Sequence, residues 1–205
     1  MAYPTVGELR SHIGVDDTGE DHRLDAALEA AVRDVEAFTG RRFVQDTTAS
    51  VRVFRPEGSV LRLPAGNDIS TTTDLVVKTD DAGNGTYGTT WTIDTDFVLE
   101  PFNGVGYDGS TGWPYTRIVT VGARWWYPYN NRGTVQITAK WGWAATPEPV
   151  RLAVLLRAAS LWKRKDAPFG VAGFGDLGLF RLRDDPDVVS LLSRYVHGSL
   201  AAVIA

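Results

Sequence analysis

Two glycine-rich loops are the first residues in this sequence whose spacing could support chemistry. The pattern G-x-G-x-x-G, which cradles a dinucleotide pyrophosphate when it joins a strand to a helix, occurs at 104–109 and again at 173–178. The first copy lies inside a β-rich stretch, and the second precedes residues 179–183, which we predict to be extended. Since neither copy joins a strand to a helix, we expect two ordinary loops and no bound cofactor.

An acidic turn and three histidines are the next candidates, and they would bind metal if they bound anything. The turn DDAGNG begins at Asp80 like a calcium loop, but Trp91 occupies the twelfth position, where a calcium loop needs a bidentate glutamate. His12, His22 and His197 have no ligand spacing with one another or with a carboxylate. We therefore predict no metal site.

Catalytic motifs with a nucleophile or a paired acid and base are also missing from the sequence. It has no G-x-S-x-G elbow, no H-E-x-x-H helix and no cysteine that could act as a thiolate nucleophile. Adjacent aspartates stand at predicted helix starts, where capping explains them. The sequence therefore predicts a protein that is not an enzyme and has no catalytic residues, with a hydrolase based on an acidic pair as a distant alternative.

Aromatic residues crowd the stretch from 113 to 143, and several are almost consecutive. Neighbouring residues on a strand point to opposite faces, so a run of aromatics leaves at least one face exposed in a monomer. Interfaces are enriched in Trp, Tyr and Arg. We therefore predict a subunit interface formed by Arg124, Trp125, Trp126, Tyr127, Tyr129 and Arg132.

Two other interpretations of the same aromatic residues stay open. One small β-sandwich could bury all of these rings, in which case no partner is needed. The other alternative belongs to a different functional class, a carbohydrate-binding module in which sugars stack on Trp125, Trp126 and Trp143.

Composition describes a folded chain of 205 residues with 43% hydrophobic and 22% charged residues. The formal net charge of −4 argues against tight binding of duplex DNA, which relies on a basic surface to displace phosphate counterions. The first residues have no secretory signal, and no apolar run approaches the ~18 residues of a membrane span. We expect neither classical secretion nor membrane insertion.

Helices are predicted at both ends of the chain. Residues 5–12 begin with a capping-box pair, Thr5 and Glu8, and residues 24–38 carry apolar side chains at helical spacing before Gly40. A third helix starts with Thr146 as N-cap and ends in a basic run, and a fourth starts at Asp185.

The middle of the chain is predicted to be a β region because short runs of Val, Ile, Thr and Trp alternate with Gly, Asn, Asp and Pro. A meander or a small sandwich fits this pattern best. The predicted strands are 50–55, 59–63, 74–79, 90–93, 97–100, 118–123 and 134–141.

This order predicts an α+β fold in which the N- and C-terminal helices pack as one helical domain with an inserted antiparallel β domain. We expect residues 1–42 and 144–198 to form the helical domain and residues 43–143 to form the inserted domain. Residues 199–205 form a short apolar tail.

Both ends of the chain resemble the head-tail connector proteins, or head-to-tail adaptors, of long-tailed bacteriophages. The N-terminal match is a short helix, an acidic loop and a long helix ending in Thr39-Gly40-Arg41. The C-terminal match is a strand ending in Trp141-Gly142, a helix over 147–165 with a basic end, a glycine-rich loop over 170–178 and a final helix over 185–195. The β region matches only as an insertion.

The resemblance implies a virion structural protein that forms a ring, commonly a dodecamer, in the virion neck between the portal protein and the stopper or tail-completion protein. DNA would pass through the ring without sequence-specific binding, and assembly would take place in the cytoplasm of the bacterial host. A tail terminator or another virion ring component is the alternative. The residues that the resemblance places against the portal are Phe174, Leu177, Phe180, Arg181, Arg183 and Tyr195.

Overall fold

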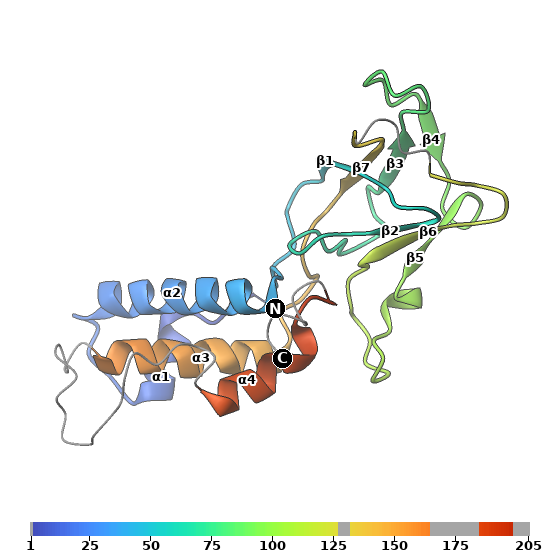
Figure 1. The fold of residues 1–205 in the computed structure, drawn as a ribbon. Coiled ribbons are helices and arrows are strands. Elements are labelled where there is room, and N and C mark those ends of the chain that lie inside the picture. The colour runs from blue at the N-terminus through green and yellow to red at the C-terminus, as the bar shows by residue number, and fades with distance from the viewer. Residues whose placement is uncertain (1, 127–131, 165–184, 199–205) are drawn as a thin grey trace. The chain divides into compact units, whose positions relative to one another are not determined.

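The computed structural model describes residues 2–126, 132–164 and 185–198, and the chain divides into two compact units (Figure 1). The first unit combines Met1–Phe43 with Thr146–Ala205 and holds the helices. The second unit is Val44–Ala145 and holds all the strands of the described residues. The predicted α+β class, with packed terminal helices and an inserted antiparallel β region, is therefore confirmed.

The helical unit is built from segments whose ends are fixed by local signals. The predicted capping box is present, since Thr5 Oγ1 accepts from the Glu8 N–H and the Glu8 carboxylate accepts from the Thr5 N–H. The second helix ends where Gly40 adopts φ of 65°, a left-handed conformation that glycine tolerates best. The elements are α1 (Val6–Ile13), α2 (Asp21–Thr39), α3 (Glu148–Lys163), α4 (Pro186–Leu192) and the 3₁₀ turn η4 (Ser193–Tyr195).

The start of α3 differs from the prediction by one residue. Pro147 is the N-cap, and the Thr146 side chain makes no capping bond to the helix. Instead, Thr146 Oγ1 donates to the carbonyl oxygen of Phe43 at 2.7 Å. Its hydroxyl therefore joins the two points at which the chain leaves the helical unit and returns to it.

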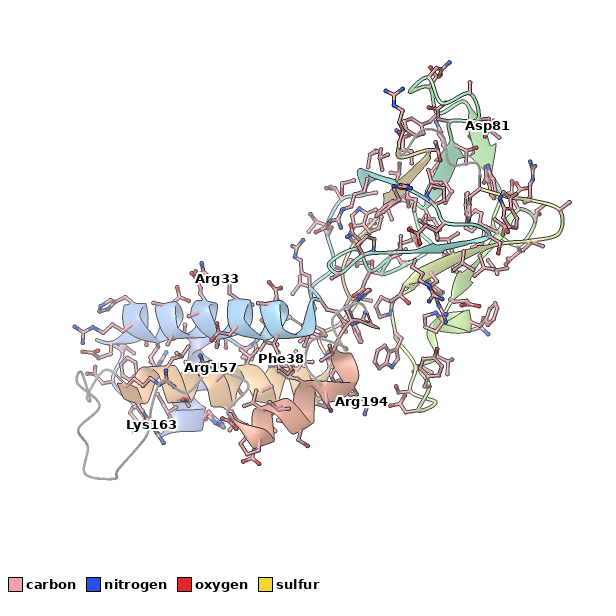
Figure 2. The ribbon with its side chains drawn as sticks, viewed as in Figure 1. Arg33, Phe38, Asp81, Arg157, Lys163 and Arg194 are labelled. Atoms are coloured by element: carbon pink, nitrogen blue, oxygen red, sulfur yellow. The ribbon has the colours of Figure 1, made fainter. Side chains whose placement is uncertain are left out.

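Helices α2 and α3 form the centre of the helical unit through their apolar faces. Arg157 of α3 lies on the side facing α2 (Figure 2), and its guanidinium nitrogens lie 2.7 and 2.8 Å from Asp34 Oδ2. Tyr3 joins the N-terminus to the end of α2, because its hydroxyl donates to Glu36 Oε1 and accepts from the Phe43 N–H. The core residues include Leu9, Leu24, Leu28, Ala31, Val35, Phe38, Phe43, Val150, Ala153, Val154, Ala158, Ala159, Trp162, Val188, Leu192 and Tyr195.

The β unit contains two antiparallel sheets with the strand orders β1-β7-β3-β4 and β2-β6-β5. Only β3-β4 and β5-β6 are neighbours that are also consecutive in sequence, whereas β1-β7, β7-β3 and β2-β6 join distant strands. The sandwich prediction therefore holds and the meander prediction is wrong. The strands are β1 (Ser50–Phe54), β2 (Val60–Arg62), β3 (Val76–Thr79), β4 (Thr89–Trp91), β5 (Phe97–Glu100), β6 (Arg117–Thr120) and β7 (Val135–Ala139), with the 3₁₀ turn η1 (Phe102–Gly104).

One core joins the two sheets. Alternate residues of β7, Val135, Ile137 and Ala139, are completely buried and belong to the same hydrophobic cluster as Ile118 and Leu99 of the other sheet. None of the helices described here combines the length and apolarity needed to cross a bilayer.

Candidate interaction surfaces

Trp126 belongs to the predicted subunit interface, but its side chain is 0% exposed in this structure. Its ring stacks on Trp91 with centroids 4.2 Å apart and planes 10° apart, inside the core of the β unit. Trp143 is 2% exposed, donates to Asp68 Oδ2 at 3.1 Å and packs against Trp113. Trp126 and Trp143 are therefore buried by residues of their own chain. Two of the three rings proposed for sugar stacking are inaccessible.

Arg124 and Trp125 remain accessible members of the predicted interface. Trp125 is 51% exposed, and Arg124 Nε donates to Asp96 Oδ1 at 2.7 Å while its guanidinium lies over the Trp91 ring. The Thr92 N–H and the Arg124 guanidinium hold the pKa of Asp96 below its ordinary value. This ion pair fixes the base of the loop that presents Trp125.

The other predicted interface residues contribute less. Arg132 is exposed and donates to the carbonyl oxygen of Gly83 at 3.0 Å, within the β unit. Tyr127 and Tyr129 lie outside the described residues.

Tyr195 is the one member of the predicted portal-docking set that the structure describes, and it is buried. It packs edge-to-face on Phe43, with centroids 6.0 Å apart, and Arg41 Nε donates to its carbonyl oxygen at 2.8 Å. Tyr195 therefore belongs to the helical core, and its side chain is only 4% exposed in this structure. The remaining members, Phe174, Leu177, Phe180, Arg181 and Arg183, lie outside the described residues.

The first G-x-G-x-x-G pattern is explained by packing against Trp113. A Cβ on Gly106 would lie 2.5 Å from Trp113 Nε1, and a Cβ on Gly104 would lie 2.9 Å from the Trp113 carbonyl oxygen. Two backbone hydrogen bonds close the loop. The backbone N–H of Trp113 donates to the carbonyl oxygen of Gly104, and the backbone N–H of Gly106 donates to the carbonyl oxygen of Ser110. These glycines therefore admit an indole ring, and the loop does not lead into a helix. The second pattern, at 173–178, lies outside the described residues.

The same loop exposes three apolar side chains, which we call the apolar loop: Phe102, Val105 and Tyr107. Phe102 is 59% exposed and Tyr107 is fully exposed, although backbone hydrogen bonds hold the loop in one shape. Sequence reasoning missed this surface. The sequence does contain a signal for it, because three large apolar residues stand within a glycine-rich turn, and such turns usually lie at the protein surface.

A second exposed apolar surface covers one face of the sheet β1-β7-β3-β4. Val51, Thr138 and Val76 form one row across β1, β7 and β3, and Val53 begins the next row with Gln136 and Lys78. Val51 is 56% exposed and Val53 is 49% exposed, whereas Phe54, the last residue of β1, is buried in the core. We call Val51, Val53 and Val76 the valine face.

The helical unit has a shallow apolar groove along α1, α3 and α4. Its rim carries Glu8 and Arg151, which form an ion pair, together with His12. The apolar lining is formed by Pro149, Leu152, Leu155 and Leu191.

The acidic turn DDAGNG is held together by its own backbone. The Asp80 carboxylate accepts from the N–H groups of Asn84 and Gly85 at 3.2 and 2.6 Å. Burial opposes its ionisation, but the N–H groups of the turn outweigh burial and lower the pKa of Asp80. Within the part of the chain that the structure describes, no group of three or more His, Asp or Glu side chains could hold a metal ion.

Comparison with known proteins shows the fold this chain shares. No protein-family model matches the sequence, and no curated protein matches it. Three structures of gene transfer agent particles each contain a similar chain of 21% identity, with alignments covering 95% of this chain and 91–92% of the other. They are the neck of an empty particle computed with C6 symmetry (TM-score 0.55), the neck of a native particle computed with C12 symmetry (0.55) and the virion of the native particle (0.58).

Proposed function

We propose that this protein is a structural subunit of a ring in the neck of a virion or virus-like particle, acting as the adaptor between the portal and the stopper or tail. The observation that carries the proposal is the shared fold over 95% of the chain with chains of neck structures computed with sixfold and twelvefold symmetry. The resemblance of both chain ends to head-tail connectors supports the same role. The two compact units are then its helical domain and its inserted β domain.

A closed ring of identical chains requires each copy to bind its neighbour through two different surfaces. The chain offers several accessible surfaces of this kind, which are the apolar loop, the valine face, the helical groove and Trp125. The net charge of −4 suits a channel that lets DNA slide, because the 25 acidic residues outnumber the 21 Lys and Arg residues and weaken the attraction for phosphates. The role requires no catalytic group.

For the portal contact, we propose Phe174, Leu177, Phe180, Arg181 and Arg183, the remaining members of the predicted set. They combine the apolar and arginine side chains that interfaces favour. The protein would assemble in the cytoplasm of the host cell and remain in the neck of the finished virion.

The deciding experiment is electron microscopy of particles made without this protein. An adaptor is needed after packaging, so we expect heads that have lost their connection to tails, and supplying the full chain in trans should restore joined particles. Normal joined particles would overturn the proposal. Tails of irregular length on intact heads would instead favour the tail-terminator alternative.

A direct binding test separates the structural role from the carbohydrate-binding alternative. We expect the purified chain to bind portal assemblies and to show no change in tryptophan fluorescence with oligosaccharides. Since Trp125 alone of the three proposed sugar-stacking residues is exposed, a glycan-dependent quench that disappears in Trp125→Ala would favour the sugar module.

A further inference from the structure

We propose that the apolar loop of one copy packs on the valine face of the neighbouring copy. This contact rests on the ring role proposed above, and it names the two surfaces that join the β units of adjacent subunits. The occupant of the valine face is therefore a second copy of this chain.

The apolar loop is shaped to act as a rigid insert. Gly106 lies against the Trp113 ring, whose Nε1 donates to Ser110 Oγ at 2.7 Å, and Trp113 in turn packs on Trp143. A loop already held in one shape loses little conformational freedom when it binds. It nevertheless leaves Tyr107 fully exposed, which is the side chain type most favoured as an interface anchor.

The valine face is the proposed receptor because Val51, Val53 and Val76 are 36–56% exposed, although the Gly133 backbone lies close to Val53. Its two rows place β-branched side chains beside Thr138 and Gln136, which have short or uncharged side chains. Beneath it, alternate residues such as Ile137 are completely buried and fix the sheet from the other side. A planar tyrosine ring can therefore lie across Val51, Thr138 and Val76, a row without a charged side chain.

Charge complementarity supports the pairing of these two surfaces. Asp108 follows Tyr107 directly, and its carboxylate is held in place by the N–H and hydroxyl of Ser110 at 3.0 and 2.5 Å. Lys78 stands in the second row of the valine face, opposite Gln136, and forms no ion pair with any residue that the structure describes. If Tyr107 lies beside Gln136, in the middle of the row, Asp108 is directed toward Lys78, which is the orientation that favours the contact.

The two surfaces cannot satisfy each other within one chain. Figure 1 shows that strands β2, β6 and β5 lie between the loop that follows β5 and the sheet that carries β1, β7 and β3. Both surfaces belong to the same compact unit, so their separation is fixed. A contact between them must join two copies, and joining unlike surfaces gives the head-to-tail arrangement that closes a ring.

Cysteine cross-linking tests the contact cleanly, because the natural chain has no cysteine. Full-length Tyr107→Cys and Val53→Cys proteins carrying different tags are mixed and treated with a short bismaleimide. We expect cross-linked dimers that carry both tags. A single chain that carries both Tyr107→Cys and Val53→Cys should give a series of cross-linked multimers. The matched control replaces Val53→Cys by Arg33→Cys on the outer side of α2, also an exposed position (Figure 2).

Equal yields from the Val53 and Arg33 pairs would overturn the contact, and so would the absence of mixed dimers. Dimers linked only through two copies of position 107 would also overturn it, since they indicate a symmetric pair.

A double-mutant cycle gives an independent measurement of the same contact. We expect Tyr107→Ser to weaken self-association by about tenfold or more, the effect of truncating an interface anchor, and Val53→Glu to do the same. The double variant should lose little more than either single variant, because both remove one contact. Circular dichroism checks that each variant is folded.

Additive losses would show that the two surfaces bind different partners. Rings that still form in the double variant would refute this contact and leave the neck role standing. A chain absent from purified particles would instead refute the neck role itself.

Discussion

Gly106→Ala is the sharpest test of how the first glycine-rich loop is built. The added Cβ would lie 2.5 Å from Trp113 Nε1 and 2.8 Å from both Cδ1 and Cε2, against the ~3.5–4.0 Å of a normal carbon contact. The Trp113 ring must therefore move by about 1 Å. It cannot move freely, because it packs on Trp143 and donates to Ser110.

The expected cost follows from these contacts. Forcing one extra carbon into a packed site costs about 1–3 kcal/mol, and the Ser110 hydrogen bond is worth about 1 kcal/mol if the indole moves away from it. We expect Gly106→Ala to lower the free energy of unfolding of the β unit by about 2 kcal/mol. For a unit of this size, the midpoint of thermal unfolding should fall by roughly 10 °C.

Urea unfolding followed by tryptophan fluorescence measures this change. Six of the seven tryptophans lie within the β unit, Val44–Ala145, so the signal reports that unit. The matched control is Gly88→Ala, where a Cβ meets nothing within 4 Å, and we expect a change below about 0.5 kcal/mol. Equal stabilities of the two variants would refute the packing argument, as would a Gly106→Ala cost that persists unchanged once Trp113→Ala removes the ring.

Three further predictions test other parts of the molecule. Trp126→Ala should destabilise the β unit by about 3–5 kcal/mol, whereas Trp125→Ala should cost less than about 0.5 kcal/mol; similar urea midpoints would contradict their opposite burial. Thr5→Ala removes the capping box of α1 and should cost the helical unit about 1 kcal/mol in unfolding followed by circular dichroism; an unchanged unfolding midpoint would contradict the capping role. The lowered pKa of Asp80 means that its stabilising effect is complete above its ordinary pKa of 3.8 and is lost as the pH falls through the lower folded value. Asp80→Asn should therefore be destabilised at pH 7 and converge on the natural protein only as the pH falls below the lowered pKa of Asp80, and a gap independent of pH would contradict this linkage.

The candidate surfaces show where sequence reasoning was limited. The run of aromatics from Trp125 to Tyr129 suggested an interface because consecutive residues on a strand face opposite ways. The structure places Trp125 and Trp126 outside any strand, and Trp126 turns inward to meet Trp91, 35 positions earlier. Exposure of a single ring depends on such distant partners, which the local pattern does not specify.

The secondary structure, in contrast, was predictable because its causes are local. The capping box at Thr5, the left-handed Gly40 and the Asp185 cap act within one helical turn, and each lies where the sequence predicts. The seven predicted strand segments each overlap an observed strand for the same reason, since alternation is read within a few residues.

Local patterns along the chain specify most helix ends and the β-rich middle, and they indicate that the loop at 104–109 is not a cofactor site, because periodicity, capping and spacing operate over short distances. Tertiary packing, in contrast, sets the pairing of β1 with β7, the burial of Tyr195 against Phe43, and the exposure of the apolar loop and the valine face. These outcomes depend on which segments far apart in the chain cover one another. The packing of the whole core determines which segments cover one another, because the interior is close-packed and has room for a limited set of side chains.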